Sequence, residues 1–283
     1  MSKNIHIISS INEMNEFSIE LKRGSKKIAL VPTMGALHEG HLSLVTRANQ
    51  IADHTVVSIF VNPTQFGQNE DFGNYTRDLE GDTDKLSSYK VDAVFLPDSK
   101  DIYPENFQTY LEVTEIQKEL CGKSRPGHFR GVATVALKLF NIVQPDYAVF
   151  GQKDFQQLKV IERFVKDLHL GVEIIPMPIV REEDGLAISS RNAYLSDEER
   201  SRALSLSKAL YAISQRFRDG CKDAGLLVEE GMNILNNSDV NDIDYLEIRD
   251  SQNLELIKTA QSGNLVAVAA KIGNTRLIDN IIL

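Results

Sequence analysis

The residues best placed to do chemistry lie in the segment PTMGALHEGH, residues 32–41. His38 and His41 are three residues apart where an apolar run gives way to a helical pattern, so both rings are expected on one side. Gly35 allows a sharp turn, and Gly40 leaves room for a ligand to approach the backbone. The start of a helix offers free N–H groups and a positive dipole end to phosphate. Two imidazoles there can donate hydrogen bonds to oxygens that gain charge during phosphoryl transfer.

Two histidines on one helical face could instead form half of a zinc site. The sequence shows no obvious third ligand, and the glycine-rich approach suits a nucleotide better. The two cysteines, Cys121 and Cys221, lie far apart without metal-ligand spacing, which is typical of reduced thiols. The segment is therefore interpreted as a nucleotide site.

Two later segments carry groups that suit a polyphosphate. In GQKD, residues 151–154, Lys153 can neutralise phosphate charge, while Asp154 could meet a ribose hydroxyl or cap the next helix. In AISSRN, residues 187–192, two hydroxyls beside Arg191 suit a mobile loop that closes over phosphates. Taken alone, the second segment would be an ordinary polar turn.

The elements that must position these groups alternate between strand and helix through the first two thirds of the chain. Such alternation predicts an α/β fold, a Rossmann-like parallel sheet with helices on its faces. Polar segments follow its strands, where ligands of such sheets bind. The expected strands are residues 27–33, 54–62, 92–97, 108–113 (peripheral), 146–151 and 171–178, and the expected helices are 11–22, 40–52, a polar stretch ending at Tyr89, 132–143 and 155–168.

The pattern changes after Pro176 and Pro178. A long amphipathic helix over residues 197–217 is predicted to begin with a capping box formed by Ser196 and Glu199. A second helix and three strand-like runs follow, at residues 223–236, 242–250, 264–273 and 275–283. The expected division is a Rossmann-like domain, residues 1–177, and a smaller α+β domain, residues 178–283.

Composition narrows the function classes. The chain has 283 residues, 42% of them hydrophobic and 25% charged, and a net charge of −9. An acidic background argues against stable binding of nucleic acid. The N-terminal residues lack the pattern of a signal peptide, and no uncharged apolar run approaches ~18 residues. We expect a cytoplasmic protein that neither binds nucleic acid nor spans a membrane.

Five segments together carry a family resemblance: VPTMGALHEGH, FVNPTQF, RPGHFRGV, VFGQKDFQQL and REEDGLAISSRN. Their order and spacing resemble the pantoate–β-alanine ligases, or pantothenate synthetases, of the HIGH/KMSKS nucleotidyltransferase superfamily. The resemblance implies an AMP-forming ligase that makes pantothenate. ATP and pantoate would give pantoyl adenylate and pyrophosphate, and β-alanine would then displace AMP.

The resemblance also implies roles for individual residues. The catalytic group would be His38, His41 (the proton donor), Lys153, Ser189 and Arg191. Pantoate would be held by Gln65 and Gln157, with Gln65 also touching β-alanine and with Asn62 and Arg125 lining the same pocket. ATP would be contacted by Met34, Gly35, Ala36, Leu37, His38, Glu39, Gly40, His41, Gly151, Gln152, Lys153, Asp154, Val180, Ile188, Ser189, Ser190 and Arg191.

The resemblance implies further partners and one departure. Mg²⁺ would accompany ATP; its protein ligands are unassigned, with Asp82 as one suggestion. The chain would form a homodimer through its N-terminal domain, and residues 178–283 would act as a lid. Ile188 stands where the family commonly has Met, a swap of similar size that should leave the loop working.

Several interpretations stay open at this stage. Amide side chains can donate to the carboxylate and hydroxyls of pantoate, but Gln65 and Gln157 alone would be unremarkable surface residues. Arg125 and His128 could be solvated loop residues. Two other functions compete: a different nucleotidyltransferase of the superfamily, and a non-catalytic nucleotide sensor. The ligase pattern argues against the first, and the complete set of charged groups argues against the second.

Overall fold

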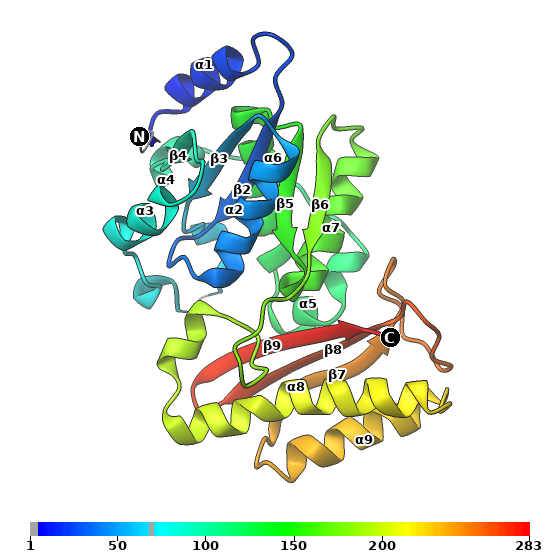
Figure 1. The fold of residues 1–283 in the computed structure, drawn as a ribbon. Coiled ribbons are helices and arrows are strands. Elements are labelled where there is room, and N and C mark those ends of the chain that lie inside the picture. Colours follow the sequence, from blue (N-terminus) through cyan, green and yellow to red (C-terminus); the bar gives the residue numbers. More distant parts are fainter. Residues whose placement is uncertain (1–4, 68–70) are drawn as a thin grey trace.

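The computed structural model describes residues 5–67 and 71–283, which include two β-sheets (Figure 1). The larger sheet has six strands in the order β1-β4-β3-β2-β5-β6, and every neighbouring pair is parallel. Its strands are β1 (His6–Ile8), β2 (Ile28–Thr33), β3 (His54–Ile59), β4 (Ala93–Phe95), β5 (Tyr147–Gly151) and β6 (Glu173–Met177). The carboxyl ends of β2, β3 and β5 therefore point to one edge, and the polar segments that follow them are the histidine turn, residues 62–66 and the GQKD turn.

Helices cover both faces of this sheet because its central strands are apolar on both sides. In β2, Ile28 and Leu30 face one core and Ala29 and Val31 face the other. The first core is closed by α1 (Ile11–Leu21), α6 (His128–Val143) and α7 (Phe155–Asp167), and the second by α2 (Glu39–Ile51) and α3 (Leu79–Ser87). The predicted Rossmann-like parallel sheet with helices on both faces is confirmed.

The sequence interpretation was wrong at three places. Residues 108–113 form no strand; their alternating pattern arises because Leu111 and Val113 pack on the core of α6 without strand partners. Strand β1 was missed because it is three residues long and mostly exposed. Helix α6 begins at His128, four residues earlier than expected, after Gly127 in the left-handed region (φ 82°). Part of the polar stretch before α3, residues 68–70, lies outside the described residues.

The smaller sheet is antiparallel, in the order β7-β8-β9. Its strands are β7 (Asp242–Arg249), β8 (Leu265–Ile272) and β9 (Thr275–Ile282), and it packs against α8 (Asp197–Arg218) and α9 (Ala224–Asn236). The Ser196–Glu199 capping box is present as predicted. In Figure 1 the two helices lie on the face of the sheet away from the six-stranded sheet, and β9 faces the turn after β5.

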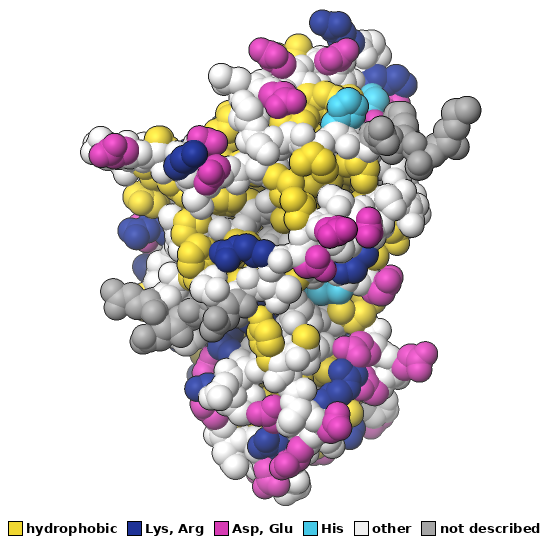
Figure 2. Space-filling view, turned by 90° about the vertical axis from the view of Figure 1, so that its left-hand side faces the viewer, with side chains coloured by type: hydrophobic (Ala, Val, Ile, Leu, Met, Phe, Trp, Pro, Cys, Tyr) yellow, Lys and Arg dark blue, Asp and Glu magenta, His cyan; other side chains and the backbone are white. Residues whose placement is uncertain are grey.

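A small apolar cluster joins the two units: Leu120 and Phe155 pack against Leu254, Leu265 and Ala267. On the face in Figure 2, Lys and Arg side chains are scattered among Asp and Glu and form no continuous basic surface. Within the described ranges, no helix is both long and apolar enough to span a membrane.

Candidate active site

The turn between β2 and α2 is held by a buried carboxylate from α3. Gly35 and Ala36 both have positive φ (83° and 51°), so the chain turns sharply after Thr33. Asp82, 1% exposed, accepts hydrogen bonds from the backbone N–H groups of Ala36 (2.9 Å) and Leu37 (2.6 Å). These bonds occupy both carboxylate oxygens, and Asp82 lies outside the cleft. Asp82 anchors the histidine turn, and its suggested role as a magnesium ligand stays a prediction.

His38 and His41 are stacked at the N-terminus of α2, with ring centroids 4.1 Å apart and planes 29° apart. Both lie on one side, as predicted. A Cβ at Gly40 would come within 3.0 Å of the His38 ring, so Gly40 makes room for that ring, and it also lines the cavity beside the two rings. The Nδ1 atoms of both rings are buried without a partner in the described part of the chain.

Both imidazoles are neutral at pH 7. Burial lowers the pKa of His38 to about 4, and the Lys153 ammonium group adds to this shift. Burial lowers the pKa of His41 to about 3, with His38 as the next cause. A neutral ring still donates one hydrogen bond. An anion in the cleft would favour the charged forms, because an opposite charge raises the pKa of an imidazole.

The GQKD turn brings a cation and an anion to the opposite side of the cleft. Residues Gln152–Asp154 form a short 3₁₀ turn directly after β5, and α7 begins at Phe155. The Asp154 side chain makes no capping bond to α7, so the capping alternative is wrong. Desolvation raises the pKa of Asp154, but the cations Lys153 and Arg191 outweigh it and hold the pKa below its usual range.

The segment with the two serines sits on a short antiparallel bridge. Arg181 pairs with Ala187, and the N–H of Ile188 donates to the carbonyl of Val180 (3.0 Å). Ser189 Oγ then accepts the N–H of Arg191 (3.3 Å) and starts a 3₁₀ turn over Ser190–Tyr194. Val180 and residues 188–191 line the same cavity as the histidine pair.

These segments line one end of a continuous cleft made of two adjoining cavities that share several lining residues. We call the first cavity the nucleotide end. Of the residues expected to contact ATP, it is lined by Met34, His38, Gly40, His41, Gly151, Lys153, Asp154, Val180, Ile188, Ser189, Ser190 and Arg191. His41, Asp154, Gln157 and Arg191 line both cavities, and so connect the two ends.

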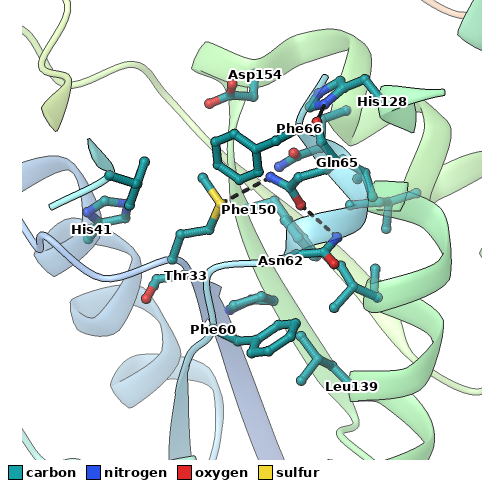
Figure 3. A pocket seen from close by; sticks show the side chains of 18 of the residues that line it. Thr33, His41, Phe60, Asn62, Gln65, Phe66, His128, Leu139, Phe150 and Asp154 are labelled. Carbon is teal, nitrogen blue, oxygen red and sulfur yellow. Dashed lines mark hydrogen bonds between the residues drawn. The ribbon is translucent and has the colours of Figure 1, made fainter. Parts of the chain in front are cut away.

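The second cavity, which we call the pantoate end after the expected substrate, is built on an amide pair (Figure 3). Asn62, 1% exposed, donates to Gln65 Oε1 (3.0 Å) and to the carbonyl of Gly131 (3.1 Å). Asn62 Oδ1 accepts from the Tyr103 hydroxyl (2.8 Å). Gln65 Nε2 then points at Met34 Sδ (3.0 Å). The side chain of Asn62 is therefore used mainly to hold Gln65 in place, and less to bind a ligand.

Arg125 and His128 line the pantoate end and make hydrogen bonds there, so they are not solvated loop residues. His128 Nδ1 lies 2.8 Å from the carbonyl oxygen of Gln65, and Arg125 Nη2 lies 3.4 Å from the same oxygen. Arg125 Nη1 and His128 Nε2 are 3.1 Å apart. Both side chains line the pantoate end with Gln157. The cleft thus gathers every residue expected to hold pantoate.

The apolar wall of the pantoate end was missed in the sequence. It is formed by Phe60, Val132, Val135, Ala136, Leu139, Phe150 and Ile161. Four of these residues lie on α6 at positions i, i+3, i+4 and i+7, a helical stripe that the sequence displays. Nothing in that stripe distinguishes a ligand wall from ordinary core, because both need the same residue types.

Known proteins resemble the chain over almost its whole length. The family model for pantoate–β-alanine ligase matches residues 6–282. The chain belongs to the pantoate–β-alanine ligase family. Pantothenate synthetase from Sulfurihydrogenibium sp. (strain YO3AOP1) is 53% identical over 278 residues, 98% of this chain and 99% of the relative. The enzyme from Thermotoga petrophila is 54% identical over 277 residues, again 98% and 99%.

Solved structures of the ligase family agree with this fold. Pantothenate synthetase from Thermus thermophilus has a TM-score of 0.93 and 42% identity, covering 98% of this chain and 99% of its own. The Francisella tularensis ligase, solved with β-γ ATP and β-alanine, has a TM-score of 0.83 and 35% identity, covering 99% and 98%. The family and the fold expected from the sequence are both confirmed.

Some residues expected to contact ATP lie outside both cavities. Leu37 is 3% exposed and belongs to the core under α2. The others are Gly35, Ala36, Glu39 and Gln152. Contact of these residues with ATP stays a prediction. In the structure they shape the turns that follow β2 and β5. As for the zinc alternative, no group of three or more His, Cys, Asp or Glu side chains that could hold a metal ion occurs among residues 5–67 and 71–283.

Proposed function

We propose that this cleft performs the reaction of the pantoate–β-alanine ligase family in two steps, through a pantoyl adenylate. The observation that carries the proposal is the convergence of five distant segments on one cleft. One end combines the neutral rings of His38 and His41 with the cations Lys153 and Arg191, and suits a triphosphate. The other combines amides with an apolar wall, and suits a small branched hydroxy acid.

In the first step, the pantoate carboxylate attacks the α-phosphorus of ATP and pyrophosphate leaves. Such a transfer needs alignment and charge neutralisation rather than a covalent enzyme intermediate. Lys153, Ser189 and Arg191 supply donors from one side and the histidine pair from the other. His41 lines both cavities, so it is placed where the two substrates meet.

In the second step, the amine of β-alanine attacks the acyl carbon and AMP leaves. Gln157 and Gln65 hold the pantoyl hydroxyls and carboxyl group by hydrogen bonds, and the α6 wall covers the gem-dimethyl group. A buried wall here also excludes water, which would otherwise hydrolyse the adenylate. Gln65, which lines the pantoate end, touches β-alanine as well.

Magnesium accompanies ATP in this proposal. Mg²⁺ keeps several waters and is held largely by phosphate oxygens in many nucleotide sites. The nucleotide end fits this mode, because its charged side chains are mainly cationic and the GQKD turn contributes only the half-exposed carboxylate of Asp154. We expect no turnover after chelation of Mg²⁺ and full recovery on its return.

The product set tests the function. Incubation with ATP, pantoate and β-alanine should give AMP, pyrophosphate and pantothenate in equal amounts. Formation of ADP and phosphate would contradict the proposal. Pyrophosphate release with a different acceptor, and none with pantoate, would favour another nucleotidyltransferase. Nucleotide binding with no product would favour the sensor.

We also propose a homodimer through the N-terminal unit. Residues 108–110 and 112 are exposed outside any helix or strand, Tyr110 by 45%, while Leu111 and Val113 pack on the core. Of their backbone N–H groups, only that of Leu111 donates a hydrogen bond within the described ranges, to Thr134 (3.0 Å). Such a segment can add to the same segment of a second copy. Light scattering should give a dimer, and Thr109→Pro should give a monomer, whereas Ile19→Ser on exposed α1 should change nothing.

Two smaller proposals concern the C-terminal unit and the place where the protein works. Residues 178–283 act as a lid domain that carries the Ser189–Arg191 segment over the nucleotide end. The protein works in the cytoplasm, which fits its ATP substrate and its two free thiols, Cys121 and Cys221. Small-angle scattering with and without a non-hydrolysable ATP analogue tests the first proposal, and cell fractionation tests the second.

A further inference from the structure

Two adjacent residues of β9 touch both phosphate-facing segments of the cleft. Asp279 and Asn280 are 4% and 6% exposed, although both are polar. Their backbones pair within the C-terminal sheet, but their side chains also hydrogen-bond to segments outside it. Burying a polar side chain is costly unless it is hydrogen-bonded, so these hydrogen bonds indicate what the two side chains do.

Asn280 holds the turn that carries Lys153. Its Nδ2 donates one hydrogen to the carbonyl of Gln152 (2.9 Å) and the other to the carbonyl of Lys153 itself (3.0 Å). Both donors of one amide are thus used on consecutive carbonyls of the 3₁₀ turn. The turn has no side-chain cap of its own at Gly151 or Asp154, so its orientation depends on this contact.

Asp279 connects the same strand to the serine segment. Its two oxygens accept from Arg181 Nη1 (2.6 Å) and Nη2 (2.9 Å). Arg181 Nη1 also donates to the carbonyl of Gly185 (3.1 Å), in the hairpin directly before Ile188 and Ser189. Asp279 Oδ1 further accepts the N–H of Asn280 (2.7 Å), which ties the two contacts together.

We propose that Asn280 is a positioning residue for the ligase reaction: its amide holds the Lys153 turn in register with the Ser189–Arg191 segment, which Asp279 and Arg181 anchor to the same strand. Both amide hydrogens of Asn280 are used on the carbonyls of the turn, so it acts through Lys153 rather than on a substrate. This inference rests on the proposed role of Lys153 at the ATP phosphates. A displaced ammonium group would slow adenylate formation, since a shift near 1 Å can cost about 10²-fold.

A double-mutant cycle tests the proposal, with pyrophosphate release in a single turnover as the readout. Lys153→Ala should slow adenylate formation strongly. Asn280→Ala should slow it by about 10-fold to 100-fold and raise KM for ATP, with KM for pantoate unchanged. In the Lys153→Ala background, Asn280→Ala should cost less than about 2-fold, because residues that act through one another are not additive.

Further variants separate positioning from folding. Asn280→Asp keeps the shape but presents a carboxylate to two carbonyls, so it should be at least as slow as Asn280→Ala. Asn264→Ala removes another side chain that bonds to backbone, at Gln261 N (2.7 Å), in the same unit and away from the cleft. It should lower the melting temperature without changing the rate of folded enzyme.

The cycle separates the role of Asn280 from that of Lys153 and from the ligase function. If Asn280→Ala costs the same factor with and without Lys153, or costs nothing, the positioning role is refuted while the ligase function stands. Equal increases in KM for ATP and for pantoate would also refute it. If Lys153→Ala itself has no effect, the assigned role of Lys153 fails, and the inference fails with it. Normal pantothenate formation in the same preparation shows that the function itself holds.

Discussion

The two ends of the cleft are prepared for their ligands in opposite ways. At the pantoate end, the polar groups already bind one another: Asn62 holds Gln65, Tyr103 holds Asn62, and His128 holds the Gln65 carbonyl. At the nucleotide end, His38 and His41 keep buried Nδ1 atoms without partners in the described chain, and their pKa values lie far below the usual 6.5.

The difference has a physical cause. A small hydroxy acid brings one charge and little binding energy, so its site must be ordered before it arrives. A triphosphate brings several negative charges, which can raise the imidazole pKa values and order cationic side chains on binding. The comparison predicts that variants at the nucleotide end will affect the rate, and variants at the pantoate end will affect the handling of one substrate.

The largest effect is expected for His41→Ala. Loss of one preorganised donor to a charge that develops in the transition state should slow adenylate formation by roughly 10²–10³. ATP affinity should change less. His54→Ala is a matched control, because His54 pairs with Asp92 (3.1 Å) at the start of β3, far from the cleft. Rapid-quench measurement of pyrophosphate release tests this prediction. An equal loss of rate in His54→Ala would contradict a catalytic role for His41.

The next effect is expected for Gln65→Ala and Gln157→Ala. Each removes hydrogen bonds to a polar ligand in a desolvated pocket, worth ~0.5–3 kcal/mol, so KM for pantoate should rise and ATP affinity should hold. Gln215→Ala, at an exposed amide on α8 that bonds Asp219 (2.9 Å), serves as the control. Should either variant lose ATP affinity with normal dependence on pantoate, the division of the cleft into two ends would be incorrect.

A smaller effect concerns acid stability. The folded pKa of His41 is about 3, below its ordinary value. Above pH 6.5, His41 is neutral in both the folded and the unfolded chain, so its titration does not reduce the free energy of unfolding. As pH falls from 6.5 toward 3, His41 becomes protonated in the unfolded chain and stays neutral in the folded chain. The free energy of unfolding therefore falls by about 2 kcal/mol by pH 5.

Thermal melts of the wild type and His41→Gln at pH 7.5 and pH 5 measure this loss. The variant should lose less stability between the two pH values, because glutamine does not titrate. Identical losses would mean that His41 is not kept neutral by its surroundings. Adding a non-hydrolysable ATP analogue should reduce the acid loss of the wild type only.

The sequence predicted the elements that carry the chemistry because their signals are local. A few neighbouring residues are enough to predict each of these elements. Examples are the apolar run before Pro32, the strand after Asp53 and the capping box at Ser196. The pattern at 108–113 misled because Leu111 and Val113 alternate for packing and not for pairing. Strand β1 is too short to give a pattern.

For the site, residue types with charge or paired histidines were predictable, and their supporting contacts were not. Asp82 reaches the histidine turn across 45 residues, and Asn280 reaches the Lys153 turn across 127 residues. No spacing rule links such positions, since only the fold brings them together. The stripe Val132–Leu139 was visible as a helix face, but its partner became clear only from the cavity that it lines.

The central claim is that the carboxylate of pantoate, bound at one end of the cleft, attacks the α-phosphorus of ATP, bound at the other end. Pantoate labelled with ¹⁸O in its carboxylate tests it most directly, because the acyl adenylate must later lose one of those oxygens with AMP. Mass spectrometry of the nucleotide product should find one ¹⁸O atom in AMP and none in pyrophosphate. Unlabelled AMP, or ADP with labelled phosphate, would contradict the account.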